Sequence, residues 1–162
     1  MTISTAPAPE AAQKLIRCVQ QGIVETFSMI FENVVPQGAD NVTGEGCNGV
    51  IGIISFVGTV PWSMIAAFPR ETAIQMMHKF AGFEIPFESA DMVDATGELV
   101  NVVAGPIIGQ LVAVGLEAKM SLPTVARGQG IEILLPSHTQ IQRLHFSSLQ
   151  GPFYVTIVTA AA

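Results

Sequence analysis

The sequence predicts an α+β fold, an antiparallel-dominated β-sheet with long α-helices packed on it. Apolar residues recur at helical spacing in the first and middle parts of the chain, whereas β-rich runs separated by turn residues fill the last third. The 162 residues suffice to bury a core, and 49% of them are hydrophobic while only 12% are charged, which argues against disorder. Helices and strands follow one another in runs rather than in strict alternation, which is typical of α+β domains.

The first element is expected to be a helix that follows a flexible N-terminus at residues 1–10. Those ten residues are small and contain prolines. Ala11–Phe31 then carries apolar residues at helical spacing, with polar residues on its other side. Pro36-Gln37-Gly38 ends this segment. We expect residues 11–162 to form a single domain.

Two strands and a second helix are predicted next. Val50–Phe56 and Val60–Phe68 are β-rich, and Gly58-Thr59 between them suits a tight hairpin with glycine at its first central position. A helix should begin at Pro69-Arg70-Glu71-Thr72 and end at Gly82, because glycine is the common C-terminal stop of a helix.

A long helix is predicted after Ser89, which is a plausible N-cap. Asp91 and Asp94 near its start complement the helix dipole. Gly105-Pro106 lies in the middle of this segment, and proline removes a backbone hydrogen bond. We therefore expect either a kink there or two consecutive helices, the second running to about Leu116.

The last third of the chain is predicted to be strands separated by turns. The β-rich runs begin at Val125 and continue with Ile131–Leu135, Ile141–Phe146 and Phe153–Val158. The turn signals between them are Gly128-Gln129-Gly130, Pro136-Ser137 and Gln150-Gly151-Pro152.

The excess of acidic over basic residues disfavours negatively charged partners. With 7 basic and 13 acidic residues the net charge is −6, which argues against nucleic acid and anionic membrane surfaces. Two uncharged stretches, Gly46–Pro69 and Leu99–Leu116, are long enough to cross a membrane. The polar residues, glycines and prolines within them argue against a membrane span. No signal peptide is recognisable, so we expect a cytoplasmic protein.

Cysteine and histidine placement predicts no metal centre. Cys18 and Cys47 are far apart, and either a disulfide or two free thiols is compatible with the sequence, free thiols being the simpler reading in a reducing cytoplasm. The three histidines fall in different elements and have no metal-ligand spacing with one another. These are His78, His138 and His145.

Glu98 and Asn101 are the residues best suited to chemistry. Their spacing places both on one face of a helix, at the start of an uncharged segment. A carboxamide can hold a water molecule and direct it at an electrophile, as in phosphoryl hydrolysis, and a carboxylate can accept a hydrogen bond from a cation. The spacing alone is more typical of two polar residues on the solvated side of a helix, because a Glu-x-x-Asn tetrad is common by chance.

The surrounding residues make the pattern more specific. The run Asp94-x3-Glu98-x2-Asn101-x3-Gly105, with Pro123 beyond it, resembles the signature of the CheX/CheC/FliY chemotaxis phosphatases. There are 21 residues between Asn101 and Pro123, one fewer than the family pattern has. A single copy of the motif is present, as in CheX-type members, whereas CheC-like proteins usually carry two.

The resemblance implies removal of the phosphoryl group from the aspartyl phosphate of a CheY-type receiver domain in a response regulator. Asn101 would orient the attacking water, and Glu98 would contact the active-site lysine of the receiver. Asp94, Gly105 and Pro123 would support the motif as a helix-start residue, a site of close approach and a loop-shaping residue. The Mg²⁺ would belong to the receiver, so this chain would need no cofactor of its own. Relatives of the CheX type also imply a homodimer.

Two other functions have less support in the sequence. A non-catalytic adaptor with the same fold would bind a receiver without hydrolysing its phosphate, but it would have no chemical need for both Glu98 and Asn101. A sensor of a small apolar ligand has no polar constellation to support it. The sequence therefore favours the phosphatase.

Overall fold

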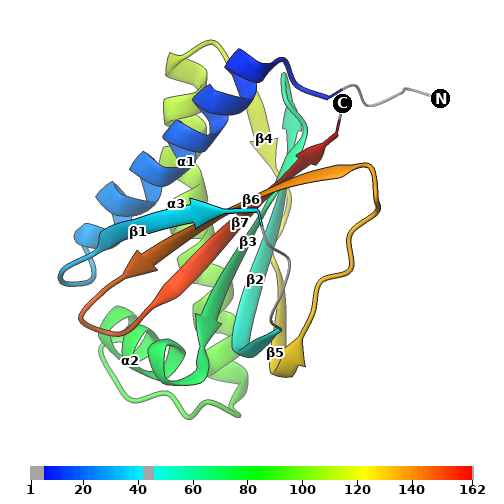
Figure 1. The fold of residues 1–162 in the computed structure, drawn as a ribbon. Helices are drawn as coiled ribbons and strands as arrows, with labels where there is room; N and C mark the ends of the chain where they lie inside the picture. Colours follow the sequence, from blue (N-terminus) through cyan, green and yellow to red (C-terminus); the bar gives the residue numbers. More distant parts are fainter. Residues whose placement is uncertain (1–5, 42–45, 162) are drawn as a thin grey trace.

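The computed structural model describes residues 6–41 and 46–161. Seven strands form one antiparallel sheet, and the helices pack on one of its faces (Figure 1). The predicted fold class is confirmed. The strand order is β1-β6-β7-β3-β2-β4, and β5 also pairs with β2. The helices are α1 (Pro9–Ser28), α2 (Arg70–Ala81) and α3 (Ala90–Ala113). The strands are β1 (Val35–Asp40), β2 (Cys47–Gly58), β3 (Trp62–Pro69), β4 (Ala118–Met120), β5 (Thr124–Ile131), β6 (Thr139–Ser147) and β7 (Phe153–Ala160).

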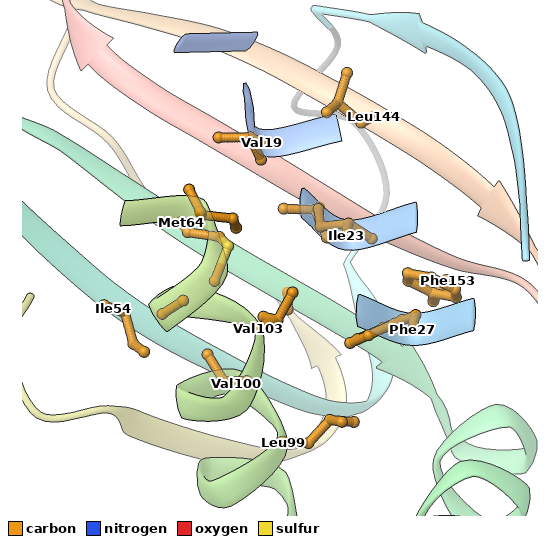
Figure 2. Packing of buried hydrophobic residues seen from close by; sticks show 14 of the residues in the cluster. Val19, Ile23, Phe27, Ile54, Met64, Leu99, Val100, Val103, Leu144 and Phe153 are labelled. Atoms are coloured by element: carbon orange, nitrogen blue, oxygen red, sulfur yellow. The ribbon is translucent and has the colours of Figure 1, made fainter. Parts of the chain in front are cut away.

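The main core lies between the helices and the sheet. Figure 2 shows side chains of α1, among them Ile23 and Phe27, meeting those of α3 and of the strands. Phe27 packs against the ring of Phe153 on β7, with ring centroids 5.1 Å apart. Trp62 is buried and its ring stacks on that of Phe56, with ring centroids 4.0 Å apart.

The other face of the sheet is covered by an extended segment rather than by helices. Ile131, Ile133 and Leu135 pack there against buried residues of the strands, including Cys47 and Ile51. The strand predicted over Ile131–Leu135 is therefore wrong beyond its first residue, which ends β5. The apolar residues that made this run β-rich serve to pack onto the sheet.

The glycines that were predicted to form a turn, Gly128-Gln129-Gly130, lie inside β5. The register of β5 against β2 shifts between Cys47 and Gly49, where Gly130 adopts a left-handed φ of 60°. The amide of Gly130 donates to the side-chain oxygen of Asn48 at 2.6 Å. The glycines thus serve a β-bulge, which needs the same backbone freedom as a turn.

The tight hairpin predicted at Gly58-Thr59 is also wrong. The last β2–β3 pair is Phe56 with Trp62, which leaves a longer loop. The reason is that β2 continues past the end of β3 and pairs with β4 as far as Gly58 and Ala118. The amide of Thr59 then donates to the carbonyl of Glu117 at 2.9 Å.

The helices largely follow the expected pattern. α1 begins at Pro9, so the expected boundary after residue 10 falls inside the helix, and residues 1–5 of that N-terminus lie outside the described residues. α2 ends at Gly82, which adopts a left-handed φ of 83° as a C-cap. α3 runs unbroken through Pro106 to Ala113, so the break into two helices did not occur. Pro106 is exposed, and water can satisfy the carbonyl that it leaves without a donor.

α3 is the one helix in the described part of the chain that is long and apolar enough to cross a membrane. In this fold 44% of its most apolar stretch is buried, and its apolar side faces the sheet. Both cysteines are buried and free, so the choice between a disulfide and two thiols is resolved in favour of the thiols.

Candidate functional site

The start of α3 is anchored by two sets of hydrogen bonds. Ser89 is the N-cap, and its hydroxyl accepts from the amide of Met92 at 3.3 Å. Arg127 on β5 donates from Nη1 to the carbonyls of Phe87 and Ser89, at 3.0 and 2.6 Å. The helix therefore begins at a defined point relative to the sheet. The sequence contained no signal for the role of Arg127.

Glycines bring α3 close to its neighbours on two sides. A Cβ at Gly52 of β2 would lie 2.5 Å from Cγ2 of Val100, and one at Gly22 of α1 would lie 2.6 Å from Cγ1 of Ile107. Neither position has room for a side chain, so α3 is seated directly on β2 and against α1. Figure 2 shows Leu99, Val100 and Val103 on the side of α3 that faces the core.

The opposite side of α3 carries the predicted site residues. Asp94, Glu98, Asn101 and Gly105 follow one another at intervals of one helical turn. Asp94, Glu98 and Gly105 are exposed and Asn101 is half-buried. A Cβ at Gly105 would meet no atom within 4 Å, so the surface beyond Asn101 is open. These four residues therefore share one solvent-facing surface, which we call the α3 polar face.

Pro123 is brought to the same place from a distant part of the sequence. A Cβ added at Gly97 would lie 3.6 Å from Cγ of Pro123 and 3.6 Å from Cγ2 of Val125. Gly97 immediately precedes Glu98 and lies one turn before Asn101. The structure thus gathers all five predicted site residues, with the proline beside the helix at the turn that carries the carboxylate.

The polar groups of this face are available to a partner. Within residues 6–41 and 46–161, no hydrogen bond or ion pair engages the side chains of Glu98 and Asn101. Two acidic residues near the helices are paired instead: Glu88 contacts Arg70 at 2.8 Å, and Glu32 contacts Lys79 at 2.7 Å. A carboxylate and a carboxamide on a rigid helix can accept from a cation and hold a water molecule at defined positions.

The histidines and acidic residues do not assemble elsewhere. Among the described residues there is no group of three or more histidine, cysteine or acidic side chains that could hold a metal ion. His78 is exposed on α2, and His138 lies in a turn. His145 pairs with Asp40 of β1, with Nε2 and Oδ2 2.7 Å apart.

Solved structures of known proteins share this fold along most of the chain. The CheX chemotaxis protein from Vibrio vulnificus is 25% identical with a TM-score of 0.73, the match covering 91% of this chain and 97% of that one. A CheC-like superfamily protein from a Shewanella species is 24% identical with a TM-score of 0.69, covering 94% and 98%. A CheX–CheY–BeF3–Mg²⁺ complex from Borrelia burgdorferi matches with 17% identity and a TM-score of 0.72, also covering 94% and 98%.

No curated protein matches the chain. The family described as "Chemotaxis phosphatase CheX" matches residues 50–147, a stretch that runs from β2 to the end of β6 and contains the whole α3 polar face together with Pro123. This match covers more than half of the chain, and the chain therefore belongs to the CheX chemotaxis phosphatase family.

Proposed function

We propose that this protein hydrolyses the aspartyl phosphate of a CheY-type receiver domain by placing the α3 polar face in the receiver's active site. The observation that carries the proposal is the pair Glu98 and Asn101, unengaged by the rest of the described chain on a helix fixed at its N-terminus and along its buried side. The Borrelia burgdorferi relative, crystallised with CheY, BeF3 and Mg²⁺, supports this choice of partner.

Asn101 orients the attacking water in this mechanism. Its carboxamide accepts one hydrogen bond from the water and directs the oxygen lone pair at phosphorus. The water oxygen bonds to phosphorus while the bond from phosphorus to the aspartyl oxygen breaks, and the electron pair leaves with the aspartate. The protons of the water end on the released phosphate and on solvent. Catalysis of this kind is mainly positioning and electrostatics, so a carboxamide suffices.

Glu98 fixes the docking geometry by accepting a hydrogen bond from the receiver's active-site lysine. Mg²⁺ is supplied by the receiver, and this chain contributes no cofactor. Asp94 at the helix start, Gly105 on the open surface and Pro123 against Gly97 support the shape of the face. The net charge of −6 supports a protein partner rather than nucleic acid or an anionic membrane.

We further propose that the protein is a cytoplasmic homodimer in which residues 11–162 form one phosphatase domain. All six residues of β1 are exposed, and among the described strands β1 pairs only with β6. A free strand edge of this kind favours pairing with a second copy of the chain.

The deciding experiment measures the loss of phosphate from candidate receiver domains of the same organism. Each receiver is followed alone, with the wild-type protein and with Asn101→Ala. We expect faster decay with the wild type and a return to the spontaneous rate with Asn101→Ala, while binding to the receiver is kept. Binding without acceleration would instead favour the non-catalytic adaptor, and neither binding nor acceleration on any receiver would refute the proposal.

A further inference from the structure

The edge of the sheet beside the α3 polar face contains a bulge. β4 and β5 both pair with β2, in which Phe56 is opposite Met120 and Ile53 is opposite Thr124. Between those two pairs, β2 has two residues and the facing segment has three. The facing residues are Ser121, Leu122 and Pro123. One extra residue on one strand is a β-bulge, a device that redirects a side chain and is frequent beside active sites.

This bulge holds a leucine out in solvent. The side chain of Leu122 is 88% exposed, the highest value among the large hydrophobic residues in the described chain. Ser121 is tied to Ser55 of β2 twice: its amide donates to the Ser55 carbonyl at 2.8 Å, and its hydroxyl accepts from the Ser55 amide at 3.1 Å. The Ser121 hydroxyl also donates to the carbonyl of Leu122 at 2.9 Å.

The residue after the leucine is equally restrained. Pro123 has a fixed φ and lies beside the helix, 3.6 Å from where a Cβ on Gly97 would be. Leu122 therefore projects from a backbone that is held on both sides, and little backbone entropy remains to be lost when a partner covers it. A pre-ordered, exposed leucine is a suitable anchor for a protein interface.

The position of Leu122 along α3 follows from the direction of β5. Pro123 lies beside Gly97, whereas Arg127 reaches the carbonyl of Ser89 at the helix start, so β5 runs antiparallel to α3. Moving back from Pro123 to Leu122 is therefore a move toward Asn101. One helical turn rises about 5.4 Å, and Leu122 is a single residue from Pro123, so it lies within about one turn of Gly97 along the helix.

The footprint of a domain docked on Asn101 is wide enough to extend to this leucine. A standard protein interface buries about 800 Å² on each partner, equivalent to a disc of about 16 Å radius. Leu122 is one residue from Pro123, which lies beside α3 at Gly97, the residue before Glu98. It thus lies well inside such a disc centred on the polar pair.

We propose that Leu122 is an apolar docking anchor for the receiver domain and sets affinity for the phosphorylated receiver without taking part in hydrolysis. This inference rests on the proposed function. It assigns two separate tasks to adjacent parts of one surface: the α3 polar face carries the chemistry, and the bulge at the sheet edge supplies apolar contact.

The test compares the steady-state kinetics of Leu122→Ala with those of wild type on the phosphorylated receiver. Losing most of one leucine side chain from an interface should raise KM about tenfold and leave kcat within twofold. Leu122→Met, which keeps the apolar volume, should restore KM. Leu134→Ala is the matched control, because Leu134 is 83% exposed on the segment over the other face of the sheet, and its KM should equal that of wild type.

The outcomes separate the inference from the function on which it rests. If wild type accelerates phosphate loss and Leu122→Ala has the KM of Leu134→Ala, the docking role of Leu122 is refuted and the phosphatase function is supported. If wild type binds the BeF3-loaded receiver without accelerating hydrolysis, and Leu122→Ala weakens that binding about tenfold, the docking role of Leu122 is supported and the phosphatase function is refuted. A shift of Leu122→Ala to a smaller species in sedimentation, with receiver affinity unchanged, would assign the leucine to contact between copies and overturn the proposal, as would a wild type that binds no receiver.

Discussion

Glu98 and Asn101 have no partner within the described chain, whereas several other polar residues on and beside the helices do. Glu25, for example, accepts hydrogen bonds from Gln21 and Gln110 at 2.8 and 3.0 Å, and Glu32 accepts from Lys79 and Gln150. Such contacts hold surface side chains to the fold. Side chains that lack them are unneeded for folding, so their replacement separates activity from stability.

Glu98→Gln should lower kcat/KM for the phosphorylated receiver by about 10- to 100-fold, the worth of one hydrogen bond to a charged group. The substitution keeps shape and removes charge. Because Glu98 is exposed and unpaired in the described chain, the free energy of unfolding should change by no more than about 0.5 kcal/mol. Steady-state kinetics and urea unfolding of the same preparation measure both quantities.

Glu132→Gln provides the matched control for that prediction. Glu132 is also exposed, but it lies on the segment over the opposite face of the sheet. The Glu132→Gln protein should have the kcat/KM and the free energy of unfolding of wild type. A Glu98→Gln protein with unchanged kcat/KM would mean that the carboxylate makes no contact with a cation of the receiver.

At the scale of elements, the sequence predicted those helices and strands whose apolar residues form a recognisable local pattern. The periodicity of α1 and α3, the Ser89 cap and the strands around Ile54 and Ile65 were all readable, because each buries one side or lies wholly in the core. β1 was missed because all six of its residues are exposed and show no alternation. β4 was missed because it has three residues and forms only by pairing with β2.

For the site, too, the sequence predicted the local arrangement on the helix but not the tertiary contacts. Helical spacing alone places Asp94, Glu98, Asn101 and Gly105 on one face. The place of Pro123 beside Gly97 depends on tertiary packing. The resemblance to the chemotaxis phosphatases indicated the residue as loop-shaping but not its position against the helix. Leu122 and Arg127 had no sequence signal, because the bulge and the reach to the Ser89 carbonyl depend on the register of β5 against β2.

The seating of α3 on β2 should depend on the missing side chain at Gly52. Gly52→Ala would place a Cβ 2.5 Å from Cγ2 of Val100, so we expect a loss of about 1–3 kcal/mol in the free energy of unfolding. Adding Val100→Ala removes the clashing methyl groups. The double variant should therefore be more stable than the sum of the two single losses predicts.

Urea unfolding of the four proteins in this double-mutant cycle gives the coupling energy. Strict additivity would show that α3 does not touch β2 at this point. Activity provides a second check, because a shift of α3 away from the sheet also moves Glu98 and Asn101 relative to Pro123. The single Gly52→Ala variant should accordingly lose activity even at temperatures where it is fully folded.

At the scale of the whole molecule, the two faces of the sheet have different environments. The helices bury one face, and the segment of Ile131, Ile133 and Leu135 covers the other, where Cys47 and Tyr154 lie. Burial raises the pKa of the Cys47 thiol above its ordinary value of 9.0, and burial likewise raises the pKa of Tyr154 above 10.0. Burial against the helical layer raises the pKa of Cys18 as well. All three groups therefore stay protonated to a higher pH in the folded chain than in the unfolded one.

This difference predicts that stability falls in alkaline solution. As pH rises through 9.0, the ordinary value of a cysteine thiol, the unfolded chain loses thiol protons that the folded chain retains, so the free energy of unfolding decreases with pH. The stabilisation is complete below 9.0 and is lost as the pH passes the raised folded-state values. Urea unfolding at one pH below 9.0 and one well above it measures the decrease. Cys47→Ala should show a smaller decrease than wild type, though not none, because Cys18 and Tyr154 remain; equal decreases in the two proteins would mean that the Cys47 thiol titrates alike in both states.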